Sequence, residues 1–134
     1  MRAADTSVVV AAFASWHERH DASRRLLDRG VRLVDHCAVE TYSVLTRLPA
    51  PHRAPAPVVA AFLQDRFPQP FLRLSAKGQR DFVAGLAARS ILGGAAYDAL
   101  VAATAARHRA ELFTLDRRAA AIYDSYGVKF TLIG

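Results

Sequence analysis

Residues 95–115 carry the sequence AAYDALVAATAARHRAELFTL, in which a helical pattern passes into a strand pattern. Ala95–His108 is dominated by alanine and other good helix formers, which predicts a helix. The apolar run Leu112–Leu115 is typical of a buried strand. A further helix over Arg117–Tyr126 and a last strand over Val128–Ile133 are expected to follow. This part of the chain therefore alternates between helix and strand.

The same alternation is expected upstream, where Val31–Val34 and Phe71–Leu74 have strand patterns. Further helices are predicted over Val8–Ser15, Asp21–Asp28, Ala38–Leu48, Pro57–Phe67 and Gly78–Arg89. Strands that alternate with helices indicate an α/β fold: a central parallel sheet of about four to five strands with helices on both faces. The length of 134 residues fits one domain, residues 1–134.

The composition is that of a folded protein, with 52% hydrophobic and 22% charged residues. Lysine and arginine outnumber aspartate and glutamate by 18 to 12, and this excess suits a polyanionic partner such as a nucleic acid. No apolar run approaches the roughly 20 residues that a membrane span needs. The single cysteine, Cys37, cannot form an internal disulfide, and its apolar surroundings favour a buried thiol over a nucleophile. We expect a cytoplasmic protein.

Four acidic residues lie where helices are predicted to start. Asp5, Asp98 and Asp116 follow expected strands or open helices, and Glu40 lies in the first turn of the helix after Val31–Val34. Each one alone could simply cap a helix, because carboxylates accept hydrogen bonds from free N–H groups and complement the helix dipole. In parallel sheets, however, sites gather beyond the carboxyl ends of the strands, where helices begin.

Asp98 is the hardest of these acids to explain as a cap. Its helix is apolar on nearly every side, so it should be buried and should bring the carboxylate into the interior or a deep cleft. A buried carboxylate is costly unless it is paired, hydrogen-bonded or bound to a metal. Arg107, the basic residue of the same helix, lies more than two turns away. Asp98 is therefore a candidate site residue.

Four carboxylates at one end of a sheet would repel one another strongly. Two of them about 4 Å apart repel by roughly 4 kcal/mol at an effective dielectric constant near 20. The cost is relieved if some of the acids are protonated or if cations lie between them, and hard oxygen ligands prefer Mg²⁺ or Mn²⁺. Clustered acids on a basic protein thus predict metal-assisted hydrolysis of phosphodiesters.

Four segments, in order along the chain, resemble the PIN-domain family and specifically the VapC-type toxins of VapBC toxin–antitoxin systems. The segment Asp5–Val10 is similar to the family's opening D-T-S-V stretch, and Glu40–Pro49 is similar to its E-x-x-S-V-L-T-R-L-P helix. Tyr97–Ala105 resembles Y-D-A-L-I-A-A-T-A, and Leu112–Arg118 resembles L-x-T-x-D-x-R-A. The likeness covers nearly the whole chain. One departure is that Met1–Ala4 is poor strand material where the family has an apolar strand.

The resemblance implies a ribonuclease toxin whose Mg²⁺ or Mn²⁺ is held by Asp5, Glu40, Asp98 and Asp116. It implies attack of a metal-activated water on an RNA phosphodiester, leaving 5′-phosphate and 3′-hydroxyl ends. Thr6 and Thr114 would lie beside the metal site. The implied partners are a second copy of the chain and a cognate VapB-type antitoxin whose C-terminal segment enters the active-site groove, in a heterotetramer or larger complex.

Some of the basic residues are candidate contacts for RNA. Arg47 and Arg117 are the arginines that we expect to line an RNA-binding groove. Trp16, together with phenylalanines such as Phe13 and Phe62, is expected to form core or dimer contacts rather than base-stacking surfaces.

Two other functions stay open at this point. One is a non-catalytic RNA- or protein-binding module on the same scaffold, with the acids acting as caps. The other is an acid-rich α/β hydrolase such as a phosphatase. That class needs a D-x-D arrangement after the first strand, and Asp5-Thr6-Ser7 lacks the second acid.

Overall fold

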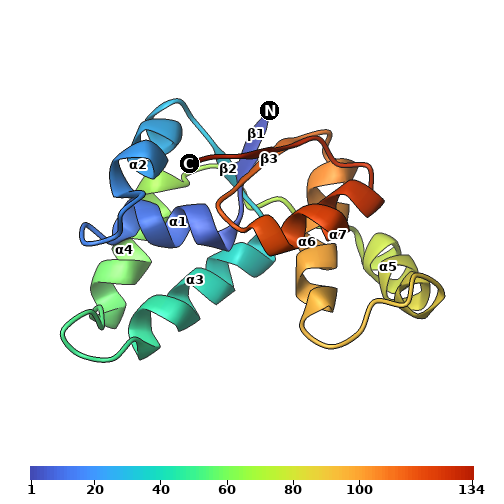
Figure 1. The fold of residues 1–134 in the computed structure, drawn as a ribbon, viewed down its shortest axis with the longest axis horizontal. Coiled ribbons are helices and arrows are strands. Elements are labelled where there is room, and N and C mark those ends of the chain that lie inside the picture. Colours follow the sequence, from blue (N-terminus) through green and yellow to red (C-terminus); the bar gives the residue numbers. More distant parts are fainter.

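The computed structural model describes residues 1–134 and is built on a four-stranded parallel sheet in the order β2-β1-β3-β4 (Figure 1). The strands are β1 (Arg2–Ala4), β2 (Arg32–Leu33), β3 (Glu111–Thr114) and β4 (Phe130–Leu132). The predicted α/β class and parallel sheet are confirmed.

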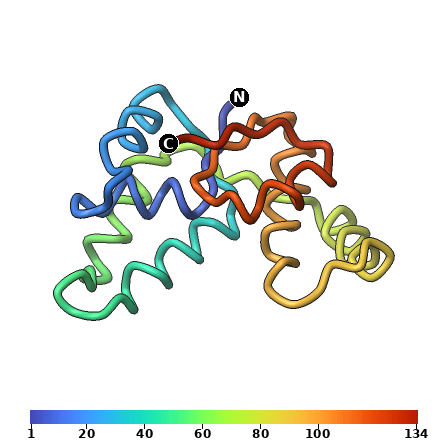
Figure 2. The backbone as a smooth tube through the Cα atoms, in the orientation of Figure 1, coloured from blue at the N-terminus to red at the C-terminus, as the bar shows by residue number.

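Seven α-helices and one short 3₁₀-helix surround the sheet. They are α1 (Thr6–Phe13), α2 (His20–Asp28), α3 (Asp35–Arg47), α4 (Ala56–Arg66), α5 (Ala76–Ala88), α6 (Ala95–Arg107), η1 (Arg117–Ala119) and α7 (Ala120–Ser125). Helices α1 to α4 gather on one side of the molecule and α5 to α7 on the other, as the colours of Figure 1 show. The two termini lie near each other at the same edge of the molecule (Figure 2).

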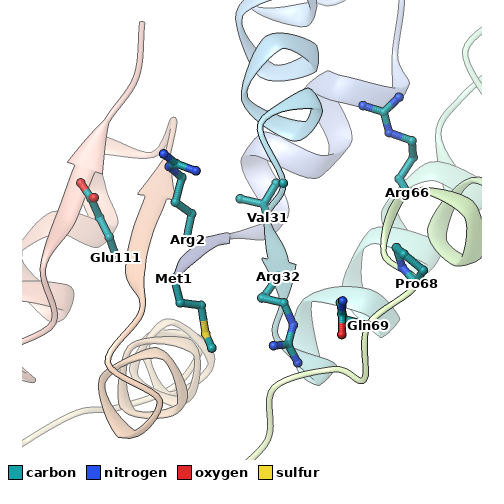
Figure 3. A pocket seen from close by; sticks show the side chains of 9 residues that line it. Met1, Arg2, Val31, Arg32, Arg66, Pro68, Gln69 and Glu111 are labelled. Carbon is teal, nitrogen blue, oxygen red and sulfur yellow. The ribbon is translucent and has the colours of Figure 1, made fainter.

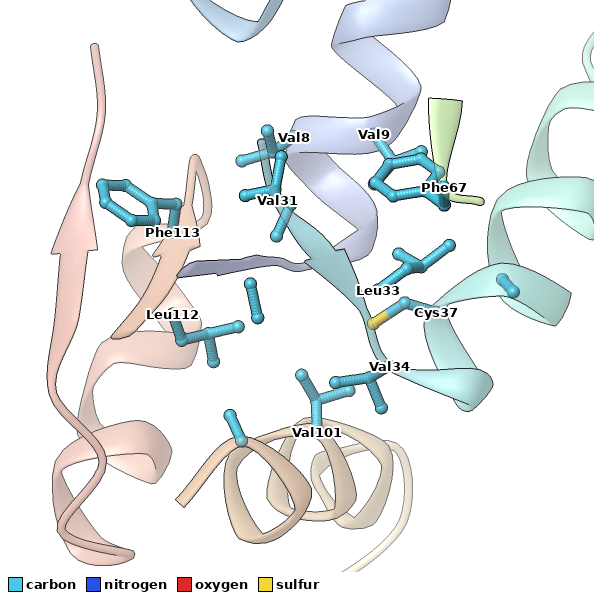
Figure 4. Close-up of a cluster of buried hydrophobic side chains, with 14 of the residues drawn as sticks. Val8, Val9, Val31, Leu33, Val34, Cys37, Phe67, Val101, Leu112 and Phe113 are labelled. Atoms are coloured by element: carbon cyan, nitrogen blue, oxygen red, sulfur yellow. The ribbon is translucent and has the colours of Figure 1, made fainter. Parts of the chain in front are cut away.

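The hydrophobic core fills both faces of the sheet (Figure 4). Val8 and Val9 of α1 pack on one face, and Val101 of α6 packs on the other. Leu112 and Phe113 are neighbours on β3 and point to opposite faces, as the pleat of a strand requires. Because parallel strands are buried on both faces, they are continuously apolar rather than alternating.

Strand β1 shows that the poor strand composition of the N-terminal residues was misleading. Ala3 pairs with Arg32 of β2 and with Leu112 of β3, so this three-residue strand lies in the middle of the sheet. Ala3 and Ala4 are completely buried. The backbone hydrogen bonds of two neighbouring strands hold the segment in place, and strong β-forming side chains are not needed.

Several element boundaries differ from those predicted. Helix α3 begins at Asp35 rather than Ala38, which places Glu40 in its second turn instead of its first. The expected strand Phe71–Leu74 is reduced to a single bridge between Leu72 and Val34. Pro68 and Pro70 precede this bridge, and proline cannot donate to a ladder. The predicted helix over Arg117–Tyr126 splits into η1 and α7.

No helix in the structure combines the length and the apolar character needed to cross a membrane.

Candidate active site

The carboxyl ends of the parallel strands meet at one edge of the sheet, and the four predicted acids meet there too. A small cavity of about 70 Å³ at this edge is named here the acidic cavity. Its lining residues are Asp5, Thr6, Ser7, Glu40, Asp98, Val101, Asp116 and Tyr123. Residues from α1, α3, α6 and the segment after β3 therefore converge on one point.

Asp5 is the most rigidly held of the four acids. It follows β1 directly, is 4% exposed and caps α1, with its Oδ1 accepting hydrogen bonds from the amides of Ser7 (3.0 Å) and Val8 (3.4 Å). The Ser7 hydroxyl donates to the same oxygen, and the Tyr123 hydroxyl donates to Oδ2 at 2.8 Å. Burial raises the pKa of Asp5, and these hydrogen bonds oppose the rise. Asp5 thus serves as a helix cap and lines the acidic cavity as well.

Asp98 lies in the first turn of α6 and is partly buried, in agreement with the argument from its apolar helix. Its pKa is raised, first by burial and then by the negative charges of Asp116, Glu40 and Asp5. Arg118 acts in the opposite direction. No hydrogen bond or ion pair within the chain compensates the Asp98 carboxylate. It faces three other acids without a partner.

Asp116 and Glu40 complete the cavity from its more open side. Asp116 caps η1 by accepting a hydrogen bond from the Arg118 amide at 2.9 Å, and its side chain is 31% exposed. Glu40 is 41% exposed and lies 3.7 Å from the His36 ring nitrogen. The His36 ring stacks against Tyr97, with the centroids 5.1 Å apart. Both acids therefore have room to turn.

The two threonines predicted beside the site have different surroundings. Thr6 lines the acidic cavity, and its hydroxyl oxygen is buried without a hydrogen-bond partner. Thr114 is fully buried and accepts a hydrogen bond from the Asp116 amide at 2.9 Å, so it holds the backbone of an acid rather than lining the cavity.

The donor set of the acidic cavity fits a hard divalent cation. Four carboxylates and an unpartnered hydroxyl surround a space that can hold an ion. Burial and then the neighbouring acids raise the pKa of Asp98, and a bound cation would oppose both effects. In the present side-chain positions, no three of the acids are close enough to hold a metal together. Glu40, Asp98 and Asp116 are only partly buried, so side-chain rotation can bring their oxygens together.

The acidic cavity opens into a larger groove of about 780 Å³, named here the groove. The groove follows α1 from Thr6 and Ser7, past Val10, to His17 and Arg19 in the loop beyond the helix. Arg117, as predicted from the sequence, and Arg118 lie at the end beside the acids. The lining residues do not include Arg47, which lies at the far end of α3 and donates a hydrogen bond to Ser43 at 2.8 Å.

A second basic cavity, of about 680 Å³, lies at the opposite end of the strands (Figure 3). Arg2, Arg32 and Arg66 line it, but their guanidinium groups point in different directions. Each is already engaged: with the Arg29 carbonyl, the Pro70 carbonyl and the Asp28 carboxylate, respectively. These arginines do not converge on one anion.

The buried thiol predicted for Cys37 is present. Cys37 is fully buried, and burial raises the pKa of its thiol far above the ordinary value. It is not a nucleophile.

The model of the PIN domain matches residues 3–125 of the chain. The chain belongs to the PIN-domain family. It is 50% identical over 133 residues, 99% of both chains, to "Ribonuclease VapC40" from two strains of Mycobacterium tuberculosis. It is 44% identical over 127 residues to "Ribonuclease VapC27" from M. tuberculosis strain H37Rv, which covers 94% of this chain and 92% of the relative. The predicted family, a PIN domain of the VapC-ribonuclease type, is confirmed.

Two residues of this PIN domain site were missed from the sequence. Ser7 donates to Asp5 and accepts a hydrogen bond from the Leu115 amide at 2.9 Å, so it ties α1 to the end of β3. Its position two residues after an acidic cap is a local signal that could have been used. Tyr123 reaches Asp5 from 118 residues away, and no sequence spacing marks that contact.

Proposed function

We propose that this PIN domain is a metal-dependent endoribonuclease toxin that cuts RNA phosphodiester bonds at the acidic cavity. The observation that carries the proposal is the convergence of Asp5, Glu40, Asp98 and Asp116 on one cavity. Relatives of nearly full length that are named ribonucleases support it. Asp5, Glu40, Asp98 and Asp116 would hold Mg²⁺ or Mn²⁺, which would supply Lewis-acid stabilisation of the charge on the phosphate.

The residues of the chain have distinct parts in this proposal. Asp5 is the fixed ligand, because Ser7 and Tyr123 hold its two oxygens. Asp98 and Asp116 line the same cavity. Glu40, at the open side of the cavity, can accept a proton from the attacking water. Arg117, in the groove, can bind an RNA phosphate next to the scissile bond. Arg118 also lines the groove, but its guanidinium lies 3.4 Å from the Asp116 carboxylate. Arg47 remains a predicted RNA contact outside the groove.

The proposal is tested by incubating total RNA with the wild type and with Asp98→Asn, each with Mn²⁺, with Mg²⁺ or with EDTA. We expect cleavage by the wild type only when metal is present, and a large loss in the variant. Asp124→Asn is the matched control, because Asp124 is an exposed acid of α7 outside the cavity. Circular dichroism and melting show whether each variant is folded. RNA binding without any cleavage by the wild type would instead support a non-catalytic module.

We further propose that the toxin acts in the cytoplasm, is inhibited by a VapB-type antitoxin and forms a homodimer, within a heterotetramer or larger complex. The exposed apolar residues Val83 (59%) and Leu92 (79%) support self-association, and α5 has no buried residue. This helix lies at one end of the molecule (Figure 1). Sedimentation of the wild type and of Val83→Lys tests the dimer, because a charge in an apolar interface should shift the protein to monomer.

A further inference from the structure

Some of the residues that line the groove come from the loop after α1. Helix α1 has eight residues, so Asp5 and the loop after Phe13 are separated by about 12 Å along the helix axis. That loop, residues 14–19, brings His17, Glu18 and Arg19 into the groove and places Trp16 beside them. These residues have no part in the proposed chemistry.

Arg19 is a cation without a partner in the chain. Its guanidinium makes no hydrogen bond or ion pair, although it lies against the backbone of Gly134. Its backbone is fixed: the Arg19 amide donates to Nδ1 of His17 at 3.0 Å, and the His17 amide donates to the Ala14 carbonyl at 2.9 Å. Glu18 is the one acid of this loop, and it makes no ion pair with Arg19. Arg19 therefore lines the groove without pairing to an acidic side chain.

Trp16 was expected in the core or at a dimer contact, and the structure places it outside the core. It is 49% exposed rather than part of the core, whereas Phe13 packs edge-on against Phe62. The His52 ring lies on Trp16 with the centroids 4.2 Å apart and the planes at 34°, which supports the indole. The Trp16 ring lies 6.0 Å from the His17 ring, and His17 accepts the hydrogen bond of the Arg19 amide, so one loop carries an exposed aromatic ring and an arginine. Unpaired nucleotides bind to such a pair when the base stacks on the ring and the phosphate pairs with the cation.

We propose that the loop of residues 14–19 is a subsite for unpaired RNA, in which Arg19 binds a phosphate and Trp16 stacks a base of the strand that is cut at the acidic cavity. His17 is a positioning residue that fixes the Arg19 backbone. The inference rests on the proposed function and adds a second contact with the RNA, made by the loop after α1 and separate from the acidic cavity. In a duplex, the bases are already stacked and cannot lie on the indole.

Binding is measured by fluorescence anisotropy with a short labelled RNA in the Asp98→Asn background with Mg²⁺, so that cleavage does not interfere. Arg19→Ala should weaken binding and lower the slope of log K against log salt by about 0.7, the value for one phosphate contact on a single strand. Arg25→Ala is the control: Arg25 is exposed on α2 and outside the groove. Trp16→Ala should weaken binding about fivefold or more without changing the slope, and Trp16→Phe should retain most of the affinity.

Trp16 is the only tryptophan of the chain, so its fluorescence reports directly on stacking. Unlabelled single-stranded RNA should quench it, and the same sequence as a duplex should not. If RNA leaves the fluorescence unchanged and Arg19→Ala binds like Arg25→Ala, the inference is wrong even when the wild type cleaves RNA. If the wild type binds RNA at this loop but never cleaves it, the proposed function fails and the subsite stands. The melting temperature of Arg19→Ala shows whether the variant loses RNA binding because it is less stable. An unchanged melting temperature excludes a purely structural role for the contact between Arg19 and Gly134.

Discussion

The hydroxyl of Tyr123 donates a 2.8 Å hydrogen bond to the carboxylate of Asp5 across 118 residues of sequence. Tyr123 is 1% exposed and Asp5 is 4% exposed, so the pair joins α7 to the end of β1 inside the protein. Ser7 holds the other oxygen of the same carboxylate. The acid nearest the core is therefore fixed before any ligand arrives, whereas Glu40 and Asp116 can still turn.

Removing the Tyr123 hydroxyl tests this arrangement. Tyr123→Phe should cost about 1–3 kcal/mol in the free energy of unfolding, because a buried carboxylate loses a donor. It should also weaken Mn²⁺ binding about 10- to 100-fold, as loss of a group that orients a ligand does. Urea unfolding and calorimetric titration with Mn²⁺ measure the two effects. Tyr126→Phe is the control, since Tyr126 lies outside the acidic cavity; equal Mn²⁺ affinity in both variants would contradict the role given to Tyr123.

Replacing Asp98 should make the metal-free protein more stable at neutral pH. Burial and three neighbouring acids raise the pKa of Asp98, so its charged form is a cost to the folded state. As the pH falls through the raised value, the folded protein takes up a proton that the unfolded chain does not, and the cost disappears. Asp98→Asn should therefore melt higher than the wild type in EDTA at pH 7, with a gain that vanishes in acid.

The controls for this pH effect are Asp124→Asn and added metal. Asp124 lies outside the acidic cavity, so its replacement should not reproduce the gain. Mn²⁺ should raise the melting temperature of the wild type more than that of Asp98→Asn. A lower melting temperature for Asp98→Asn in EDTA would show that the carboxylate has a stabilising partner.

Removing the unpartnered hydroxyl of Thr6 should affect RNA cleavage but not the stability of the fold. Thr6→Val keeps the side-chain shape and removes a buried oxygen that has no hydrogen bond, so stability should be unchanged or slightly higher. RNA cleavage should fall about tenfold or more if the hydroxyl orients a ligand or water. Thr41→Val is the matched control, because the Thr41 hydroxyl is also buried and unpartnered but does not line the acidic cavity. If Thr6→Val and Thr41→Val cleave RNA at the same rate, the Thr6 hydroxyl has no role in cleavage.

Cys37 should be unreactive in the folded protein. Burial raises the pKa of its thiol, so a thiol reagent at pH 8 should modify the protein only after unfolding in urea. Cys37→Ala should cleave RNA at the wild-type rate and lose about 1 kcal/mol of stability through the small space that it leaves. Rapid modification of the native protein would show that the core opens at α3.

The sequence predicted the α/β class, the parallel sheet and the convergence of four acids, because helix and strand periodicities and acids at helix starts are local signals. It did not predict the central place of β1, since Ala3 and Ala4 owe their conformation to hydrogen bonds with strands 29 and 109 residues away in register. Nor did it predict Tyr123, whose role depends on how α7 packs. The sequence did not decide whether Trp16 is buried or exposed, because an aromatic residue after an apolar helix has the same pattern in both cases.

Helix α1 joins the cap residue Asp5 at its start to the loop of Arg19 at its end. Because the helix is rigid, it fixes the distance between the acidic cavity, where the RNA is cleaved, and the loop that carries Trp16. A variant in which α1 is longer by one turn would place the loop of Trp16 about 5.4 Å farther from the acids. On the same RNA, cleavage would then occur at a different number of nucleotides from the base that stacks on Trp16. The length of α1 thus determines where the RNA is cleaved.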